Sequence, residues 1–158
     1  GLVRGHLSGE TESARARLQA LMVAYGFQAV EREGRLVFLP LPERPSALIE
    51  PGETALNEEG LGGLSEVRAA EAEVTGRVRL GFVAAEAEYG DRVADAVFPG
   101  DGADGVSASD LPLALTGPEG QAVAERWLAE ARVARDQVRF SLPPSRRGLG
   151  AGALVALG

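Results

Sequence analysis

The stretch over residues 116–144 constrains the fold of this chain most, because its hydrophobic period changes partway along it. Thr116 is a favourable N-cap, Pro118 falls in the first helical turn, and Glu119 completes a capping box. Behind this cap, apolar residues recur at three- and four-residue steps, which predicts an amphipathic helix over residues 118–135. Its apolar stripe comprises Val123, Trp127, Leu128, Ala131 and Ala134.

A strand follows this helix almost directly. Val138, Phe140 and Leu142 alternate with polar residues, which is the pattern of a half-buried strand, and two prolines then end it. A helix that leads into a strand favours an α+β fold, here with antiparallel or mixed sheets and two main helices. We expect the helix to pack on a sheet through Trp127 and Leu128, and Phe140 to lie in the core or at an interface.

The N-terminal part predicts a second helix and a hairpin. The helix opens near Thr11 or Ser13, and Gly26 ends it as a C′ glycine. Residues 27–32 and 35–39 then form a hairpin across the two-residue turn Glu33-Gly34. Tyr25 and Phe27, at the junction of helix and hairpin, are also predicted core or interface residues.

Proline and glycine residues mark an irregular connection after the hairpin. We expect a helix-plus-hairpin subdomain over residues 1–45, an irregular connection over 46–64 with one short strand at 47–49, and a β-rich part with the long helix over 65–158. A single domain overall is the alternative. Because the chain begins with Gly and ends on an apolar run, we expect it to be a fragment of a longer protein.

The β-rich part predicts four further strands, over residues 77–83, 92–98, 107–115 and 149–157. Pro112 places the third of them at a sheet edge, because proline cannot donate a hydrogen bond to a neighbouring strand. A looser alternation over residues 67–75 precedes the first of them, and Gly76, between these two runs, is compatible with a bulge or with one long bent strand.

The composition excludes several kinds of chemistry. The chain of 158 residues has no cysteine, and all 16 of its basic residues are arginine, so thiolate and lysine chemistry are absent. The net charge is −7, and residues 50–110 hold 14 acids against 4 arginines. This argues against a nucleic-acid surface there and is compatible with a basic partner. No run approaches the ~20 apolar residues of a membrane span, so we expect no membrane insertion.

One loop is a candidate for a ligand. Asp101, Asp104 and Asp110 lie in a segment rich in glycine and hydroxyl groups, which suits a cation such as Ca²⁺. Their spacing is not that of an EF-hand, and an exposed turn is the preferred interpretation. His6 has too few partners for a metal site or a catalytic relay. No catalytic motif occurs, so we predict no catalytic residue, no cofactor and no enzyme.

Five segments together resemble the putative phage-tail protein family. They are SARARLQALMVAYGF (13–27), VEREGRLVF (30–38), RVRLGF (77–82) followed by Tyr89, AERWLAEAR (124–132) and VRFSLPP (138–144). The resemblance is to the hub region of the large baseplate protein of gene transfer agents and long-tailed phages. It implies a homo-oligomeric ring, a trimer, at the end of the tail tube, where DNA would pass without specific binding. In gene transfer agents the family member carries a glycosidase-like barrel that this sequence does not contain, so the resemblance supplies no catalytic residues.

The resemblance therefore implies a structural component of a tail baseplate hub. It would join subunits or domains to other tail and baseplate proteins in a virion or virus-like particle assembled in the bacterial cytoplasm. The alternative is a carbohydrate- or peptidoglycan-binding module that uses the acidic loop over residues 101–110. A third hypothesis, a hydrolase, requires two carboxylates facing one another in a pocket.

Overall fold

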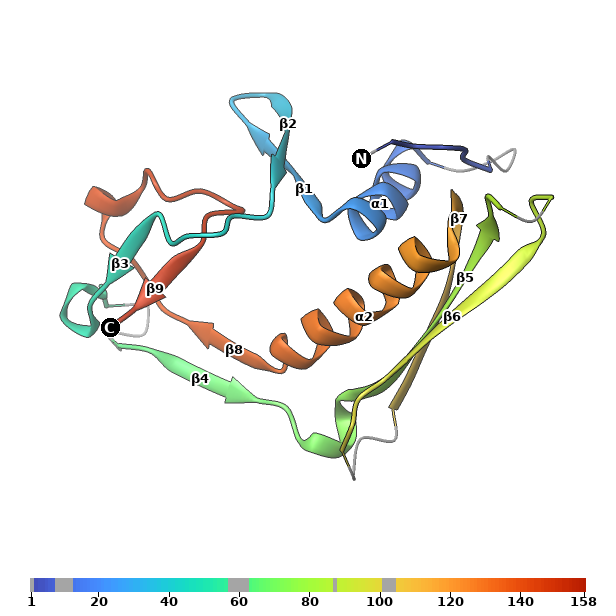
Figure 1. Cartoon of the computed structure of the whole chain (residues 1–158). Helices are drawn as coiled ribbons and strands as arrows, with labels where there is room; N and C mark the ends of the chain where they lie inside the picture. Colours follow the sequence, from blue (N-terminus) through green and yellow to red (C-terminus); the bar gives the residue numbers. More distant parts are fainter. Residues whose placement is uncertain (1, 8–12, 57–62, 87, 101–104) are drawn as a thin grey trace. The chain divides into compact units, whose positions relative to one another are not determined.

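The computed structural model describes residues 2–7, 13–56, 63–86, 88–100 and 105–158 (Figure 1). The chain forms two compact units. Unit 1 comprises Gly1–Tyr25 and Ala69–Arg135, and unit 2 comprises Gly26–Arg68 and Asp136–Gly158. This division differs from the predicted one over 1–45, 46–64 and 65–158, because the first helix and the hairpin that follows it fall in different units. Segments distant in sequence, rather than neighbouring ones, make up each unit.

Unit 1 is built on a three-stranded mixed sheet of β5 (Thr75–Ala84), β6 (Asp91–Val97) and β7 (Gly105–Leu115). The strand order is β6-β5-β7, with β5 antiparallel to β6 and parallel to β7. The prediction that the strand with Pro112 lies at a sheet edge is confirmed. A register shift between Thr75 and Arg77 shows that Gly76 lies at a bulge, so the first of the two alternatives holds.

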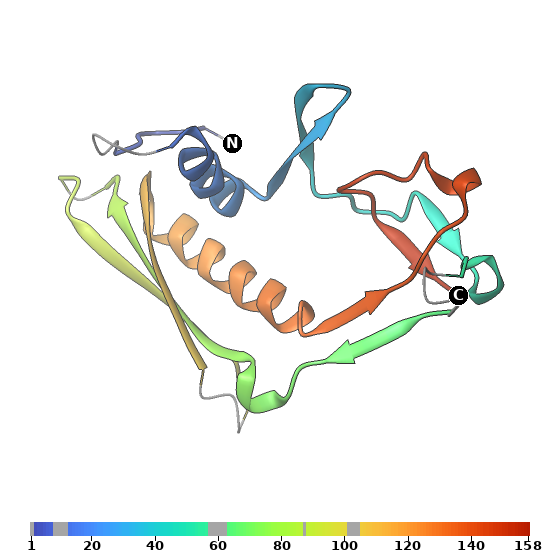
Figure 2. The same cartoon turned by 180° about the vertical axis from the view of Figure 1, so that it is seen from behind.

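Helix α2 (Gly117–Val133) packs on this sheet, as the two opposite views in Figure 1 and Figure 2 show. Its predicted capping box is confirmed, since Glu119 N donates to Thr116 Oγ1 at 3.3 Å and Thr116 N donates to Glu119 Oε2 at 2.9 Å. The helix lies very close to the sheet at Gly120, where an added Cβ would come within 2.4 Å of Phe82 Cε1. Any larger side chain at position 120 would force helix and sheet apart.

Helix α1 (Ala14–Tyr25) contacts α2 and β7. Ala16 N donates to Ser13 Oγ at 3.2 Å, which supports Ser13 as the N-cap, whereas Thr11 lies outside the described residues. Gly26 has a φ of +63°, the left-handed conformation expected of a C′ glycine. Of the helices in the described part of the chain, none is long and apolar enough to cross a membrane.

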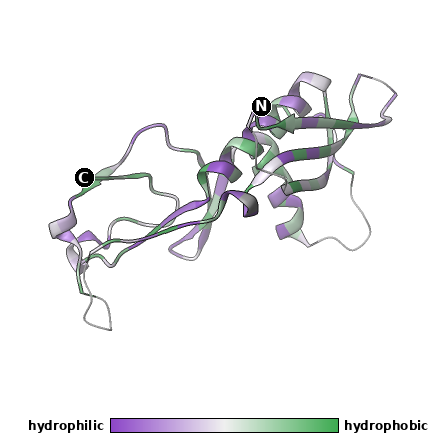
Figure 3. Cartoon of the chain, turned by 90° about the horizontal axis from the view of Figure 1, so that it is seen from below, coloured by the Kyte–Doolittle hydropathy of each residue, from purple (hydrophilic) through white to green (hydrophobic). Residues whose placement is uncertain are grey.

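The core of unit 1 lies between the sheet and the two helices. Leu128 is buried in it, whereas Tyr25 and Trp127 are half-buried and pack against its margin. Figure 3 shows hydrophobic and hydrophilic residues alternating along the strands of this sheet. The buried residues of the core cluster are Ala20, Ala24, Val78, Leu80, Phe82, Ala94, Ala96, Leu111, Leu113, Leu115, Val123, Ala124 and Leu128.

Unit 2 consists of three separate two-stranded sheets. Strands β1 and β2 form the predicted antiparallel hairpin, and positive φ values at Glu33 (51°) and Gly34 (72°) give it a type I′ turn. Strand β3 pairs in parallel with β9, and β4 pairs antiparallel with β8. The strands are β1 (Phe27–Arg32), β2 (Arg35–Pro40), β3 (Ala47–Ile49), β4 (Ser65–Arg68), β8 (Asp136–Arg139) and β9 (Val155–Leu157).

Two predicted strands of unit 2 are shorter than expected. The strand expected over 138–142 ends at Arg139, because its partner β4 is only four residues long, and beyond it Ser141 makes an isolated bridge to Ala55. The strand expected over 149–157 forms only at Val155–Leu157, because Ala153 N donates back to Gly150 O at 3.1 Å in a turn. Short 3-10 helices complete the chain at Pro51–Glu53, Glu71–Glu73 and Pro144–Arg146.

Candidate assembly interface

Unit 2 buries few apolar side chains. Ile49 is the only buried apolar residue among the residues of unit 2 that the structure describes. Phe27 and Phe140, both predicted as core or interface residues, are only half-buried. Nine larger apolar residues of this unit are exposed: Leu36, Phe38, Leu41, Leu48, Leu56, Val67, Val138, Leu154 and Leu157.

The β1–β2 hairpin has one covered face and one open face. The covered face carries Gln28 and Val30, and Gly152 lies so close to them that an added Cβ would be 2.7 Å from Gln28 Oε1. On the open face, Ala29 lies opposite Phe38, and the rings of Phe27 and Phe38 meet edge to face at 5.8 Å between centroids. Phe38 is nevertheless 53% exposed and Leu36 54% exposed. The sequence predicted the hairpin but not which face would be open.

The outer face of the sheet in unit 1, opposite α2, mixes charged and apolar residues. Arg77 Nε donates to Asp95 Oδ1 at 2.8 Å, and this pairing lowers the pKa of the Asp95 carboxyl and raises the pKa of the Arg77 guanidinium. Val93, Val97 and Val106 flank this pair and are each close to 60% exposed. The face therefore presents valines with nothing covering them around an ion pair whose charges are already balanced.

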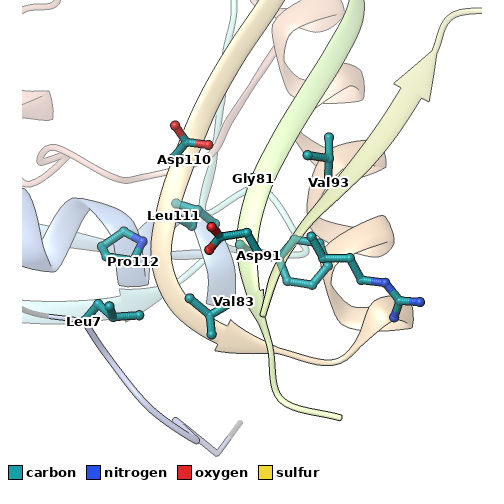
Figure 4. Close-up of a pocket in the computed structure, with 10 residues that line it drawn as sticks. Leu7, Gly81, Val83, Asp91, Val93, Asp110, Leu111 and Pro112 are labelled. Atoms are coloured by element: carbon teal, nitrogen blue, oxygen red, sulfur yellow. The ribbon is translucent and has the colours of Figure 1, made fainter. Parts of the chain in front are cut away.

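A hollow of about 520 Å³ lies on the same face (Figure 4). Asp91 and Asp110 line it beside apolar residues that include Val83 and Leu111. An added Cβ on Gly81 would come within 1.9 Å of Asp110 Oδ1, so this carboxylate lies directly over Gly81 on the neighbouring strand. Of the predicted cation ligands, Asp110 lies here, whereas Asp101 and Asp104 lie outside the described residues. The described residues contain no group of three potential metal ligands.

The N-terminal segment covers part of the edge of β7. His6 forms an antiparallel bridge with Leu113, and Leu7 N donates to Pro112 O at 2.8 Å. Arg4 Nη1 donates to both carboxylate oxygens of Glu119, at 2.6 and 2.7 Å, and this bond, together with the capping box, lowers the Glu119 pKa to about 2. His6 thus belongs to a strand-edge contact.

A cluster that sequence reasoning missed joins α2 to the segment before β5. Arg132 and Arg135 both donate to the carboxylate of Glu71, and the pairing with Arg132 is the main reason why the Glu71 pKa is lowered. The Arg132 guanidinium also lies 3.8 Å from the centre of the Phe98 ring. The partners are 61 and 64 residues apart, so no local sequence pattern could indicate the contact.

The opposite edge of the sheet borders a groove. Strand β6 is an edge strand, and a hollow of about 550 Å³ lies between it and α2. Phe98, Leu128 and Ala129 supply apolar atoms to it. Gln121 Nε2 donates to Glu125 Oε1 at 2.9 Å and to the main-chain oxygen of Asp95 at 3.2 Å. The groove thus combines an open strand edge, an apolar lining, the Glu125 carboxylate and the Arg132 guanidinium, which pairs with Glu71.

Fold and surface together define an α+β protein with one cored unit and one unit of exposed β-ribbons. A family model described as Putative phage tail protein matches residues 13–158, and the chain belongs to that family. A solved chain from a structure titled "Virion of native gene transfer agent (GTA) particle" is similar, with a TM-score of 0.93 and 50% sequence identity over 99% of this chain. This chain spans 36% of that one. Comparison with curated proteins gave no match.

Proposed function

We propose that this chain is a structural component of a baseplate hub at the end of a phage-like tail, where it joins neighbouring subunits. The observation that carries the proposal is the exposure of apolar side chains in unit 2, where Ile49 alone is buried among the described residues. Isolated two-stranded sheets are marginally stable in water. Such ribbons gain stability when other polypeptides cover their apolar faces.

The comparisons support this role. The family is one of phage tail proteins, and the similar solved chain comes from a gene transfer agent particle. Accordingly, the proposed location is the tail of a virion or virus-like particle, and the partners are further copies of this chain, in a ring of three, and other tail proteins. The role is structural rather than catalytic.

The charge of the chain is compatible with a position near the DNA path. A net charge of −7 repels the phosphate backbone, so DNA would pass such a ring without being retained. Specific nucleic-acid binding is not part of the proposal, because the acidic segment over residues 50–110 disfavours it.

Localisation in the particle tests the proposal. The parent gene product would carry a small epitope in the turn at Arg147-Gly148, where both residues are exposed, and antibody-bound gold would mark it in negatively stained particles. We expect gold at the distal end of the tail. Gold on the capsid or along the tail shaft would contradict the hub assignment, and a particle with the same epitope on a capsid protein serves as the control.

A further inference from the structure

We propose that the open edge of β6 in one copy of this chain binds strand β2 of a second copy, which extends the sheet beside α2. The inference rests on the proposed function, because it names the contact through which copies would assemble. The two surfaces are called here the edge groove (the outward edge of β6 with Gln121, Glu125, Leu128 and Ala129 of α2) and the donor hairpin (β1 and β2).

The hydrogen bonds of β6 show which residues face outward. Phe98 N donates to Gly76 O at 2.8 Å, and Ala84 N donates to Gly90 O at 2.8 Å, so both ends of this ladder bond to β5 through even-numbered residues of the β6 segment. The alternation of an antiparallel pair then directs the main-chain groups of Val93, Asp95 and Val97 away from β5. In the described part of the chain, β6 pairs with no strand other than β5.

One of these outward main-chain groups already accepts a hydrogen bond, from a side chain instead of a neighbouring strand. The main-chain oxygen of Asp95 accepts a hydrogen bond from Gln121 Nε2 at 3.2 Å. A side-chain amide therefore occupies the place where a neighbouring strand would donate. Strand addition to such an edge is a common mode of peptide recognition.

The charge in the edge groove favours a basic strand. The Glu125 carboxylate accepts a bond from Gln121, and among the described residues no arginine pairs with it. The Asp95 carboxylate is neutralised by Arg77 on the outer face of the sheet. Arg132 also lines the groove, but its charge is balanced by the Glu71 carboxylate, so Glu125 is the acidic group left for an incoming cation.

The donor hairpin offers a strand of matching chemistry. Its type I′ turn makes Arg32 and Arg35 the hydrogen-bonded pair next to the turn, so the main-chain groups of Leu36 and Phe38 point away from β1. Strand β2 is an edge strand of its two-stranded sheet. Arg35 is exposed, and the described residues contain no ion-pair partner for it.

The side chains of the two strands also match face by face. Residues hydrogen-bonded opposite one another place their side chains on the same face of a sheet. Because Leu36 and Phe38 are two residues apart, one of them would lie opposite Asp95 and the other opposite Val93 or Val97, with the remaining valine as a diagonal neighbour. Leu36, Phe38, Val93 and Val97 are now all more than half exposed. The side chain of Arg35 would project to the other face, toward α2 and Glu125. The free main-chain groups, the exposed apolar side chains and the opposite charges of Arg35 and Glu125 therefore all favour the pairing of β2 with β6.

Because the edge groove and the donor hairpin are different surfaces, the contact is heterologous. Each copy would give one hairpin and receive one. Such contacts close into a ring when the rotation that relates neighbouring copies is a full turn divided by a whole number.

Disulfide trapping between two variants tests the pairing. The chain has no cysteine, so Phe38→Cys mixed with Val93→Cys or Val97→Cys can cross-link only at the introduced sites. We expect a covalent mixed dimer from at least one mixture under mild oxidation. Val106→Cys, an equally exposed valine on the opposite edge strand of the same face, is the matched control and should not cross-link with Phe38→Cys. Each variant is first checked for native circular dichroism.

Charge reversal gives a second, independent readout. Arg35→Glu and Glu125→Arg should each weaken self-association by about tenfold in analytical ultracentrifugation, and the double variant should restore it. Arg147→Glu, at another exposed arginine of unit 2, should leave self-association unchanged.

Each outcome decides for or against the proposal. A chain that self-associates but gives no cross-link at Val93 or Val97, or no rescue in the double variant, overturns the pairing and leaves the hub role intact. A chain that stays monomeric at all concentrations also overturns it. The hub role fails separately, when gold labels a site away from the tail end.

Discussion

The two units differ in where their stability comes from. In unit 1, one continuous cluster around Val78, Leu80 and Phe82 is buried between a sheet and two helices. In unit 2, the residues that the structure describes include a single buried apolar side chain, Ile49, and three sheets of two strands each. Under the proposed function, unit 1 is stabilised by its own core, whereas the sheets of unit 2 are completed by assembly. The same leucine-to-alanine substitution should therefore cost much more stability in unit 1 than in unit 2.

The largest contrast is expected between two leucines. Leu80 is fully buried, so Leu80→Ala should destabilise the isolated chain by ~3–4 kcal/mol through lost burial and a new cavity. Leu36 is 54% exposed, so Leu36→Ala should cost less than ~0.5 kcal/mol. Urea unfolding followed by circular dichroism measures both. Equal losses would remove the distinction between the units.

A second prediction concerns the close contact of α2 with the sheet. Gly120→Ala should destabilise unit 1 by ~2–3 kcal/mol, because the new methyl group would overlap the buried Phe82 ring. Gly117→Ala is the matched control in the same helical turn. Its Cβ would meet only the end of the flexible Arg92 side chain, at 3.0 Å, so its stability should change by less than ~0.5 kcal/mol. Similar thermal midpoints for the two variants would contradict this packing.

A third prediction tests whether Trp127 lies at the margin of the core of unit 1. A fully buried tryptophan replaced by alanine costs ~3–5 kcal/mol. Since Trp127 is half-buried at the margin of the cluster, we expect Trp127→Ala to cost ~1–2 kcal/mol and to leave a folded chain. A native near-ultraviolet spectrum is unsuitable as a check once the indole is removed, so amide dispersion in NMR spectra is the readout. An unfolded variant would place Trp127 in the core proper.

The smallest expected effect depends on pH. The Glu119 pKa is lowered to about 2 in the folded chain from an ordinary value of 4.5, chiefly by hydrogen bonding from Arg4 and the main chain of Thr116. A lowered pKa stabilises the fold above pH 4.5, and this stabilisation is lost as the pH falls toward 2. Both partners are about 40% exposed, so its size should be only ~1 kcal/mol. Relative to Glu119→Gln, the wild-type chain should thus lose its advantage between pH 4.5 and 2.

Arg4→Gln separates the two contributions to this pH dependence. It removes the ion pair but keeps the capping box, so the pH-dependent difference should shrink without disappearing. An unchanged pH profile in Arg4→Gln would show that Arg4 does not influence Glu119 in solution.

Local signals in the sequence were sufficient for much of the fold. The cap at Thr116, the Gly26 stop and the Glu33-Gly34 turn each depend on neighbouring residues, and the structure contains all three. Strand alternation likewise placed Val78, Leu80 and Phe82 on one buried face. These features are set within a few residues, so periodicity and capping rules suffice.

The remaining features depend on contacts between distant segments. Strand β8 is short because β4 is short, and its partner lies about seventy residues away, in a stretch whose alternation is weak. The division into units likewise follows from α1 packing on α2 and β7 rather than on the hairpin beside it. For the candidate interface, the sequence predicted Phe27 and Phe140 as core or interface residues, but not Leu36, Phe38 or the open edge of β6. Exposure depends on what the rest of the chain leaves uncovered.

Hydrogen–deuterium exchange of the free chain and of assembled particles, compared unit by unit, tests the central claim most directly. In the free chain, the amides of β1, β2, β4 and β8 should exchange much faster than those of β5, and assembly should slow the exchange of unit 2 by at least tenfold while β5 changes little. Equal protection of both units in the free chain, or no slowing of unit 2 in the particle, would contradict the claim that assembly completes unit 2.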